Sequence, residues 1–275
     1  MNILNATRVV LSVAAAVTVV YASPASAAAQ DRQEMVALEW RETMEPGSRL
    51  FLHNMNGGIT VGRATGNQVE VIVRKSWRRS DPELVRVEAR RTGGGRNATI
   101  CAFWTENGSC EEESYTSGRR RGGNRDMDVN VTYEVMLPDG VNLYARTVNG
   151  GLSIDGVSGS VDARTVNGAV RASSMGGPVQ AETVNGAINV KMGTAGSSGL
   201  RYKTVNGAIT IELPDDFAGH LSLRTVNGSL QSDFPITVQG RFNPRRIDAQ
   251  IGEGGPRLEA ETVNGGVRLR KASGN

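Results

Sequence analysis

Two acidic segments near one histidine carry the side chains best suited to chemistry. Asp215 and Asp216 stand in "ELPDDFAGH" shortly before His220, and Asp139 stands in the similar "MLPDG". Two carboxylates at a set distance could hydrolyse a glycosidic bond. A Pro-Asp pair after a strand is more typical of a turn, in which the Asp accepts a hydrogen bond from nearby backbone. We therefore expect turns here, and an exposed loop position for His220.

Recognised signatures of other chemistry are absent from the sequence. It has no Gly-x-Ser-x-Gly elbow, phosphate loop, zinc signature or Asp-rich calcium repeat. We predict no catalytic residue, no metal site and no cofactor. The alternative is a β-helix-type carbohydrate-active enzyme, which requires the acidic residues to act together.

The two cysteines, Cys101 and Cys110, stand close together in "CAFWTENGSC". Such a pair in an exported chain is typical of a disulfide, here closing a hairpin loop with "ENGS" as its turn. Free thiols and a metal site are the alternatives. A metal site is disfavoured because the only histidines, His53 and His220, do not stand at ligand spacing from the cysteines.

Arginine is concentrated in the N-terminal half of the chain. The clusters are "RKSWRRS" (74–80), "ARRTGGGR" (89–96) and "SGRRRGGNR" (117–125), although the formal net charge of the whole chain is only +3. Arg/Gly tracts can bind nucleic acid, but an exported protein rarely meets any. The remaining interpretations are a solvated loop and contact with an anionic envelope surface. For that contact the candidate residues are Arg78, Arg79, Arg119, Arg120 and Arg121.

The first 27 residues have the pattern of a cleaved signal peptide. Arg8 precedes an apolar run from Val9 to Tyr21 and an Ala-x-Ala ending at Ala27. That run is shorter than the roughly 20 residues that cross a bilayer. The pattern predicts cleavage after Ala27, or alternatively after Ala29. We expect a periplasmic or secreted mature protein with no transmembrane segment and no lipid anchor.

The tetrapeptide Thr-Val-Asn-Gly occurs six times in the C-terminal half. Such repetition is typical of stacked units rather than of catalysis. In each copy, apolar or small residues stand two and four positions before the Thr, and again five and seven after it. A two-residue bend at Asn-Gly keeps both sets on one face. The predicted bends are Asn149-Gly150, Asn167-Gly168, Asn185-Gly186, Asn206-Gly207, Asn227-Gly228 and Asn264-Gly265.

This pattern also predicts how the bend residues are used. Asn and Gly both tolerate positive φ, which would explain their place in a tight turn. The Thr should face the interior, as Thr204 shares its face with Leu200 and Ile209. A Thr ladder inside the protein is therefore favoured, and an exposed water-ordering or sugar-binding row is the alternative.

Two architectures can use such a unit: a β-solenoid with Asn-Gly corners, or an antiparallel meander of hairpins. Successive Thr residues are 18, 18, 21, 21 and 37 positions apart. Hairpins have no reason to repeat Thr-Val before the turn, whereas stacked coils place identical residues above one another, where they can bond. We predict an all-β solenoid of about 18–21 residues per coil, with one copy lost near Asn243.

The N-terminal half is also predicted to be β-structure, with almost no helix. "LFLHNMNGGITV" is a degenerate seventh copy with Met55 in place of Val, and several alternating strands follow it. The predicted organisation is a signal peptide at 1–27, a β-strand region with the Arg-rich and Cys loops at 28–140, and the repeat solenoid at 141–271. The last two should be continuous.

The order of these segments resembles a known family. "LFLHNMNGGITV", "VNVTYEVMLPDGVNLYARTVNGG", the serial "TVNG" units and the closing "IGEGGPRLEAETVNGGVRLRK" are similar to the bacterial β-strand-repeat domains of unknown function catalogued as "putative adhesins". The likeness covers roughly Leu50 to Lys271. The Arg-rich and Cys loops depart from the family pattern, so no role is carried over to them.

What the resemblance implies is an exported, solenoid-like protein without an assigned activity. We expect a non-catalytic cell-envelope protein that serves as an adhesin-like structural or binding module. Its expected partners are envelope polysaccharide, an anionic lipid surface or another envelope protein, and not nucleic acid.

Overall fold

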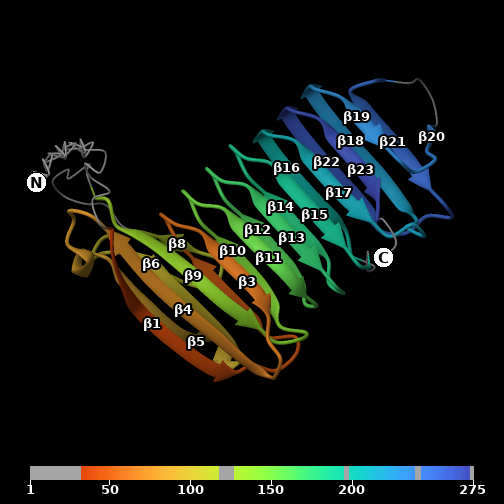
Figure 1. The fold of residues 1–275 in the computed structure, drawn as a ribbon. Coiled ribbons are helices and arrows are strands. Elements are labelled where there is room, and N and C mark those ends of the chain that lie inside the picture. The colour runs from red at the N-terminus through yellow and green to blue at the C-terminus, as the bar shows by residue number, and fades with distance from the viewer. Residues whose placement is uncertain (1–31, 118–126, 195–197, 239–242, 273–275) are drawn as a thin grey trace, which may run out of the picture. The chain divides into compact units, whose positions relative to one another are not determined.

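A computed structural model describes residues 32–117, 127–194, 198–238 and 243–272 of the chain. The predicted signal peptide, residues 1–27, lies outside these residues. The part from Arg32 onward forms one compact unit. It consists of two long sheets that enclose a single apolar core (Figure 1).

Sheet A runs, in spatial order, through β1 (Gln33–Thr43), β4 (Gln68–Trp77), β9 (Asn130–Leu137), β3 (Ile59–Arg63), β11 (Leu152–Val157), β13 (Val170–Ser174), β15 (Ile188–Met192), β17 (Ile209–Leu213), β23 (Val267–Lys271) and β19 (Leu230–Ser232). Sheet B runs through β20 (Thr237–Val238), β21 (Arg246–Ile251), β18 (Gly219–Asn227), β22 (Arg257–Asn264), β16 (Leu200–Asn206), β14 (Val179–Glu182), β12 (Val161–Arg164), β10 (Asn142–Arg146), β2 (Arg49–His53), β6 (Asn97–Phe103) and β5 (Arg86–Thr92). A small third sheet pairs β7 (Ser109–Cys110) with β8 (Tyr115–Thr116).

Helix is limited, in the described residues, to two short 3-10 turns, η1 (Pro82–Leu84) and η2 (Gly93–Gly95). The predicted near-absence of helix is confirmed for that part of the chain. Neither turn has the length or hydropathy of a membrane-crossing helix.

Each Thr-Val-Asn-Gly unit forms one coil of a β-solenoid. Its first strand lies in sheet B, the chain bends at Asn-Gly, and its second strand lies in sheet A. Leu200 and Tyr202 on β16 and Ile209 on β17 are at most 1% exposed, so the alternating positions face one interior. Successive coils pair in parallel and in matching register. The predicted solenoid is confirmed, and the hairpin meander is wrong for the repeats because the two strands of a unit lie in different sheets.

Two ladders of side chains join the coils at these corners. Each Thr hydroxyl donates to the backbone carbonyl of the Gly in the neighbouring coil, as Thr183 does to Gly168 at 2.9 Å. Five of the six Asn residues donate a side-chain amide N–H to the Asn of a neighbouring coil, as Asn185 does to Asn167 at 2.8 Å, and Asn149 accepts from Asn167. All six Thr residues are buried, as the alternation predicts. The Thr column is thus an internal ladder, and the interpretation as an exposed row is wrong.

The glycines of these corners are needed for a different reason than the one predicted. Of the six, only Gly265 has a φ in the left-handed range, at 152°. A Cβ on Gly186 would lie 1.9 Å from the carbonyl oxygen of Gly168, and one on Gly207 would lie 1.9 Å from that of Gly186. The expectation that the corner glycines adopt a positive φ is therefore wrong at five of the six corners. Glycine is required because stacked backbones approach too closely for any side chain.

The coils do not stack in the order of the chain. The last coil, β22 and β23, lies between the coil of β16 and β17 and the coil of β18 and β19 (Figure 1). Its Asn264 donates to Asn206 on one side and accepts from Asn227 on the other. The described residues on either side of Asn243 form no further coil: the segment before the last coil instead contributes β21, which pairs antiparallel with β18. The 37-residue spacing between Thr225 and Thr262 therefore contains the strand that covers the end of the stack, β21, and the segment that brings the chain back to the other side of β18.

Antiparallel strands close both ends of the stack. At one end β4 pairs antiparallel with β1 and β9, and β5 pairs antiparallel with β6. At the other end β21 covers β18. The degenerate copy, β2 and β3, stacks directly on β10 and β11. Strands from the 28–140 and 141–271 ranges therefore share both sheets.

Candidate functional site

Several large side chains on the outer face of sheet B are buried although their strand positions point away from the core. Phe51 and His53 on β2 alternate with the core residues Leu50 and Leu52, yet both are fully buried. Tyr144, paired with Phe51 across the sheet, is 7% exposed. Since apolar side chains on an outer face require a cover, this end of sheet B is overlaid by another segment.

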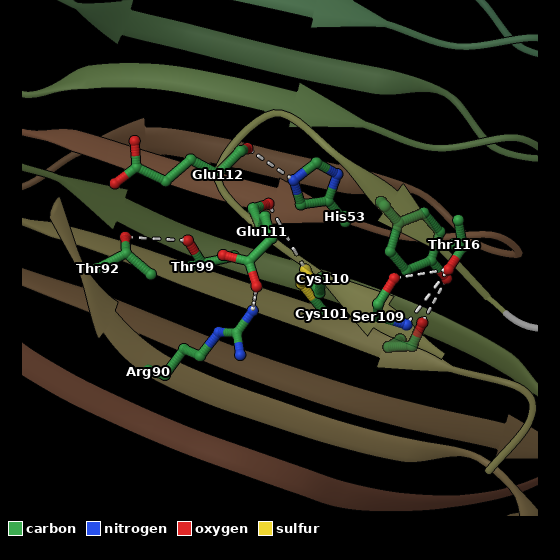
Figure 2. The surroundings of a disulfide bond; sticks show 12 residues. His53, Arg90, Thr92, Thr99, Cys101, Ser109, Cys110, Glu111, Glu112 and Thr116 are labelled. Carbon is green, nitrogen blue, oxygen red and sulfur yellow. Dashed lines mark hydrogen bonds and ion pairs between the residues drawn. A yellow bond between two sulfur atoms is a disulfide. The ribbon is translucent and has the colours of Figure 1, made fainter. Parts of the chain in front are cut away.

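That cover is residues 104–117, here called the outer loop (Figure 2). It leaves β6, forms the two-stranded β7–β8 hairpin and is tied to the sheet by the Cys101–Cys110 disulfide. Tyr115 of the loop stacks on His53 with ring centroids 5.4 Å apart. Its hydroxyl donates to the carbonyl oxygen of Ala102 at 2.5 Å. The disulfide therefore holds the loop against the outer face.

The place of the disulfide differs in one respect from the predicted hairpin. The strand of Cys110 pairs with Tyr115 and Thr116, not with the strand of Cys101. The hairpin that carries Cys110 turns at Glu111–Ser114, where Glu111 N–H donates to the Ser114 carbonyl at 2.7 Å. "ENGS" is thus the bend that leads back to Cys110, and not the turn of a hairpin closed by the disulfide.

Three consecutive glutamates at the tip of the outer loop bind the sheet beneath. Glu111 forms an ion pair with Arg90 at 3.3 Å, and Glu112 accepts from Asn97 at 2.9 Å. Figure 2 shows the Glu112 carbonyl directed at the His53 ring, 3.0 Å from Nε2. Glu113 reaches Arg49 at 3.6 Å. The acidic triplet therefore acts as a second fastening beside the disulfide.

Burial under the loop changes the chemistry of His53. Its Nε2–H donates to the Glu112 carbonyl, and its Nδ1 is buried without a hydrogen-bond partner in the described part of the chain. Burial lowers the pKa of His53 to about 4, the Glu112 hydrogen bond opposes that shift, and the charge of Arg146 adds to it. The ring is consequently held neutral with the proton on Nε2.

This state of His53 predicts an acid-dependent loss of stability. Its folded pKa lies below the unfolded value, so the unfolded chain takes up the proton more readily. The free energy of unfolding should therefore fall as pH drops from about 6.5 to about 4, by about 3 kcal/mol from this group. His53→Gln, which cannot titrate, should remove that slope in urea titrations at several pH values. His220→Gln, at an exposed position on β18, should keep it. An unchanged slope in His53→Gln would contradict the assignment.

Removal of the disulfide should loosen the outer loop and lower stability moderately. The bond closes a segment of sequence separation 9, for which loop-closure entropy gives about 2–3 kcal/mol. We expect Cys101→Ala/Cys110→Ala to unfold at lower urea concentration by that amount. Wild-type protein reduced before denaturation is the control and should match the variant. Equal midpoints for oxidised wild type and the variant would show that the bond contributes nothing.

The arginines proposed from the sequence are only partly described. Arg78 and Arg79 are exposed just after β4, and their backbone N–H groups both donate to Asp128 Oδ2 at 3.1 Å. Hydrogen bonds from Ser80, and more weakly from these two N–H groups, lower the pKa of Asp128 to about 2. The backbone of this segment is thus fixed while its guanidinium groups face solvent. Arg119, Arg120 and Arg121 lie outside the described residues.

The acidic residues considered for catalysis lie in turns. Asp139 pairs with Arg63 at 2.5 Å and accepts from the Ser158 hydroxyl at 2.9 Å. Asp215 and Asp216 are exposed in the turn that follows β17. Over the residues that the structure describes, no three His, Cys, Asp or Glu side chains gather to hold a metal ion.

The outer loop was missed by the sequence analysis, although two signals pointed to it. Phe51, His53 and Tyr144 occupy outward positions of alternating strands, which is unusual for aromatic residues on a bare face. The "EEE" run directly follows Cys110 and precedes the repeats. Together they would have predicted an acidic segment lying over an aromatic patch.

Comparison with known families agrees with this architecture. A family model described as Toastrack DUF4097 matches residues 123–270, which is more than half of the chain. The chain belongs to the Toastrack DUF4097 family. In this Toastrack chain the match spans β9 to most of β23, and β1 to β8 precede it. The resemblance to a family of unknown function is thereby confirmed.

Three solved structures show distant likeness to this Toastrack protein. They are a "putative cell adhesion protein" from Clostridium sporogenes ATCC 15579 (11% identity, 88% of this chain and 100% of that chain covered, TM-score 0.38), a "putative adhesin" from Bacteroides fragilis NCTC 9343 (12%, 88% and 99%, TM-score 0.29) and a "putative adhesin" from Parabacteroides distasonis ATCC 8503 (10%, 88% and 98%, TM-score 0.23). No curated protein matches the chain.

Proposed function

We propose that this chain is an exported, non-catalytic module of the cell envelope that binds a polyanionic envelope component. The observation that carries the proposed location is the disulfide between Cys101 and Cys110, which fastens the outer loop to the sheet. Structural disulfides persist in oxidising compartments outside the cytoplasm. The signal-peptide pattern of residues 1–27 supports the same location.

Binding is favoured over catalysis by the use that the fold makes of its polar groups. The Thr and Asn side chains of the corners form hydrogen bonds between coils. Asp139 forms an ion pair with Arg63 and accepts a hydrogen bond from Ser158. The catalytic alternative therefore gains no supporting observation. What a stack of coils provides is a long, stiff body with two polar outer faces, which suits adhesion-like or scaffolding contact.

The proposed contact is the arginine cluster at the antiparallel end of the stack. Arg78 and Arg79 are exposed there on a backbone fixed by Asp128, and Arg119, Arg120 and Arg121, which lie outside the described residues, are the other candidates named from the sequence. Guanidinium groups pair well with phosphate and carboxylate. Binding should accordingly weaken as salt rises from about 0.05 to about 0.5 M, because exposed charges are screened within about 10 Å at 0.1 M.

The test measures binding of the mature protein to isolated envelope polysaccharide and, separately, to vesicles containing phosphatidylglycerol. Arg119→Ser/Arg120→Ser/Arg121→Ser should lose most of the binding to whichever probe is the partner. Arg171→Ser/Arg224→Ser/Arg270→Ser is the matched control, since these exposed arginines lie on the repeats and remove equal charge. Salt-insensitive binding that survives in the first variant would overturn the proposed contact.

A further inference from the structure

A cavity of ≈ 300 Å³ lies beside the outer loop, on the outer face of sheet B. Its floor includes Tyr144, Asp162 and Gln180, which are register neighbours on β10, β12 and β14. Glu113 of the outer loop lines one side. The cavity thus forms where the covered end of the outer face meets the bare face of the repeats.

The charges around this cavity leave one cation without a carboxylate partner. Arg49 pairs with Glu113 at 3.6 Å. Arg164 binds both carboxylate oxygens of Asp162, at 2.7 and 2.8 Å. Arg146, in contrast, forms no ion pair with any residue that the structure describes. It lies over the Tyr144 ring at 4.4 Å and donates from Nη1 to the Glu113 carbonyl at 3.3 Å.

Two hydrogen-bond donors at the cavity are buried and unused. The Tyr144 hydroxyl and Arg146 Nε have no partner in the described ranges, and Tyr144 is 7% exposed. Such donors cost free energy, and because both atoms are inaccessible to solvent, a ligand oxygen could satisfy either one only after its side chain shifts toward the cavity. Partial burial lowers the pKa of Arg146, and the neighbouring Arg164 charge adds to this effect. Arg146 is therefore a partly desolvated cation held in place by an aromatic ring and a carbonyl.

We propose that this cavity binds an acidic saccharide, with the sugar carboxylate on Arg146. The site deepens the proposed envelope-binding function and rests on it. A carboxylate is planar and pairs with a guanidinium through two parallel hydrogen bonds. It also brings a single negative charge to Arg146, whereas a phosphate dianion would face stronger repulsion from Glu113 and Asp162.

The surroundings of Arg146 suit hydroxyl groups on the same ligand. The Gln180 side chain is exposed at the rim and forms no hydrogen bond with any residue that the structure describes. Beyond it, the outer face continues with polar side chains such as Arg201 and Glu259, which pair across β16 and β22. A saccharide chain anchored at Arg146 would run along this face, across strands spaced about 4.8 Å apart.

The experiment is calorimetric titration of the mature protein with trigalacturonate, with the neutral trisaccharide maltotriose and with inorganic phosphate. Trigalacturonate should bind most tightly. Arg146→Gln should weaken it about tenfold or more, as expected for loss of a charge-assisted pair. Arg171→Gln, an exposed arginine on sheet A, removes the same charge and should leave the affinity within about twofold.

A second variant keeps the test decisive if Arg146→Gln disturbs the outer loop. Gln180→Glu is nearly isosteric and lies at an exposed position. Its added carboxylate repels the carboxylates of the ligand, so the affinity for trigalacturonate should fall several-fold. Equal binding of maltotriose, tighter binding of phosphate, or unchanged affinity in both variants would overturn the site. Envelope binding without trigalacturonate binding would refute this inference and leave the proposed function standing. Trigalacturonate binding without envelope binding would refute the proposed envelope-binding function and leave the saccharide site at Arg146 standing.

Discussion

Gly186→Ala is expected to lower the free energy of unfolding by about 3 kcal/mol or more, although it adds a single methyl group. The added Cβ would lie 1.9 Å from the Gly168 carbonyl oxygen and 2.5 Å from its carbon. Both atoms are backbone, so no side-chain rotation can relieve the contact. Relief requires the coils to separate, which would break the flanking ladder bonds of Asn185 and Thr183.

The matched control for this substitution is Gly66→Ala. Gly66 lies in an exposed turn, its φ is not in the left-handed range, and an added Cβ would meet no atom within 4 Å. It should therefore change stability by less than about 0.5 kcal/mol. Urea denaturation of both variants gives the comparison. Similar midpoints for the two would show that the corners yield easily and that close stacking is not why glycine is required.

Leu269→Asp is expected to have a still larger effect, near the end of the chain. Positions this close to a terminus are usually tolerant. Leu269 is 0% exposed, however, and its strand position is paired with Ile211 on β17 and Ser232 on β19. The substitution loses apolar packing and buries a carboxyl group, so we expect a loss of about 5 kcal/mol or failure to fold.

The neighbouring Arg270→Asp provides the control. Arg270 shares the strand with Leu269 but points outward and is exposed, so its charge reversal should cost less than about 1 kcal/mol. Circular dichroism and urea denaturation measure both. Native stability in Leu269→Asp would refute the placement of the last coil inside the stack.

The candidate sites could be anticipated only where a local pattern was sufficient. Cys101 and Cys110 are close in sequence, and their bond follows from that proximity. The lack of an ion-pair partner for Arg146 among the described residues could not be anticipated, because it depends on which carboxylates bind Arg49 and Arg164 instead. Glu113 comes from a loop more than thirty residues earlier, and only its folding over sheet B places it there.

The sequence by itself determined the coil. Alternation around Thr204 places the Thr with Leu200 and Ile209 on an inner face, and identical repeats make ladders of Thr and Asn. These are local properties, since strand periodicity and a bend decide which way each side chain points. The same six copies could not specify their order, because each presents the same edges and the same apolar face to any other.

Tertiary structure decided the rest. It placed the coil of Thr262 between those of Thr204 and Thr225, where Asn264 bonds both neighbours. The antiparallel β21 occupies the far side of β18, so the returning chain can pair only on the side facing β16. Close stacking likewise set the need for glycine at Gly186. Both outcomes depend on contacts between segments distant in sequence, which no single repeat encodes.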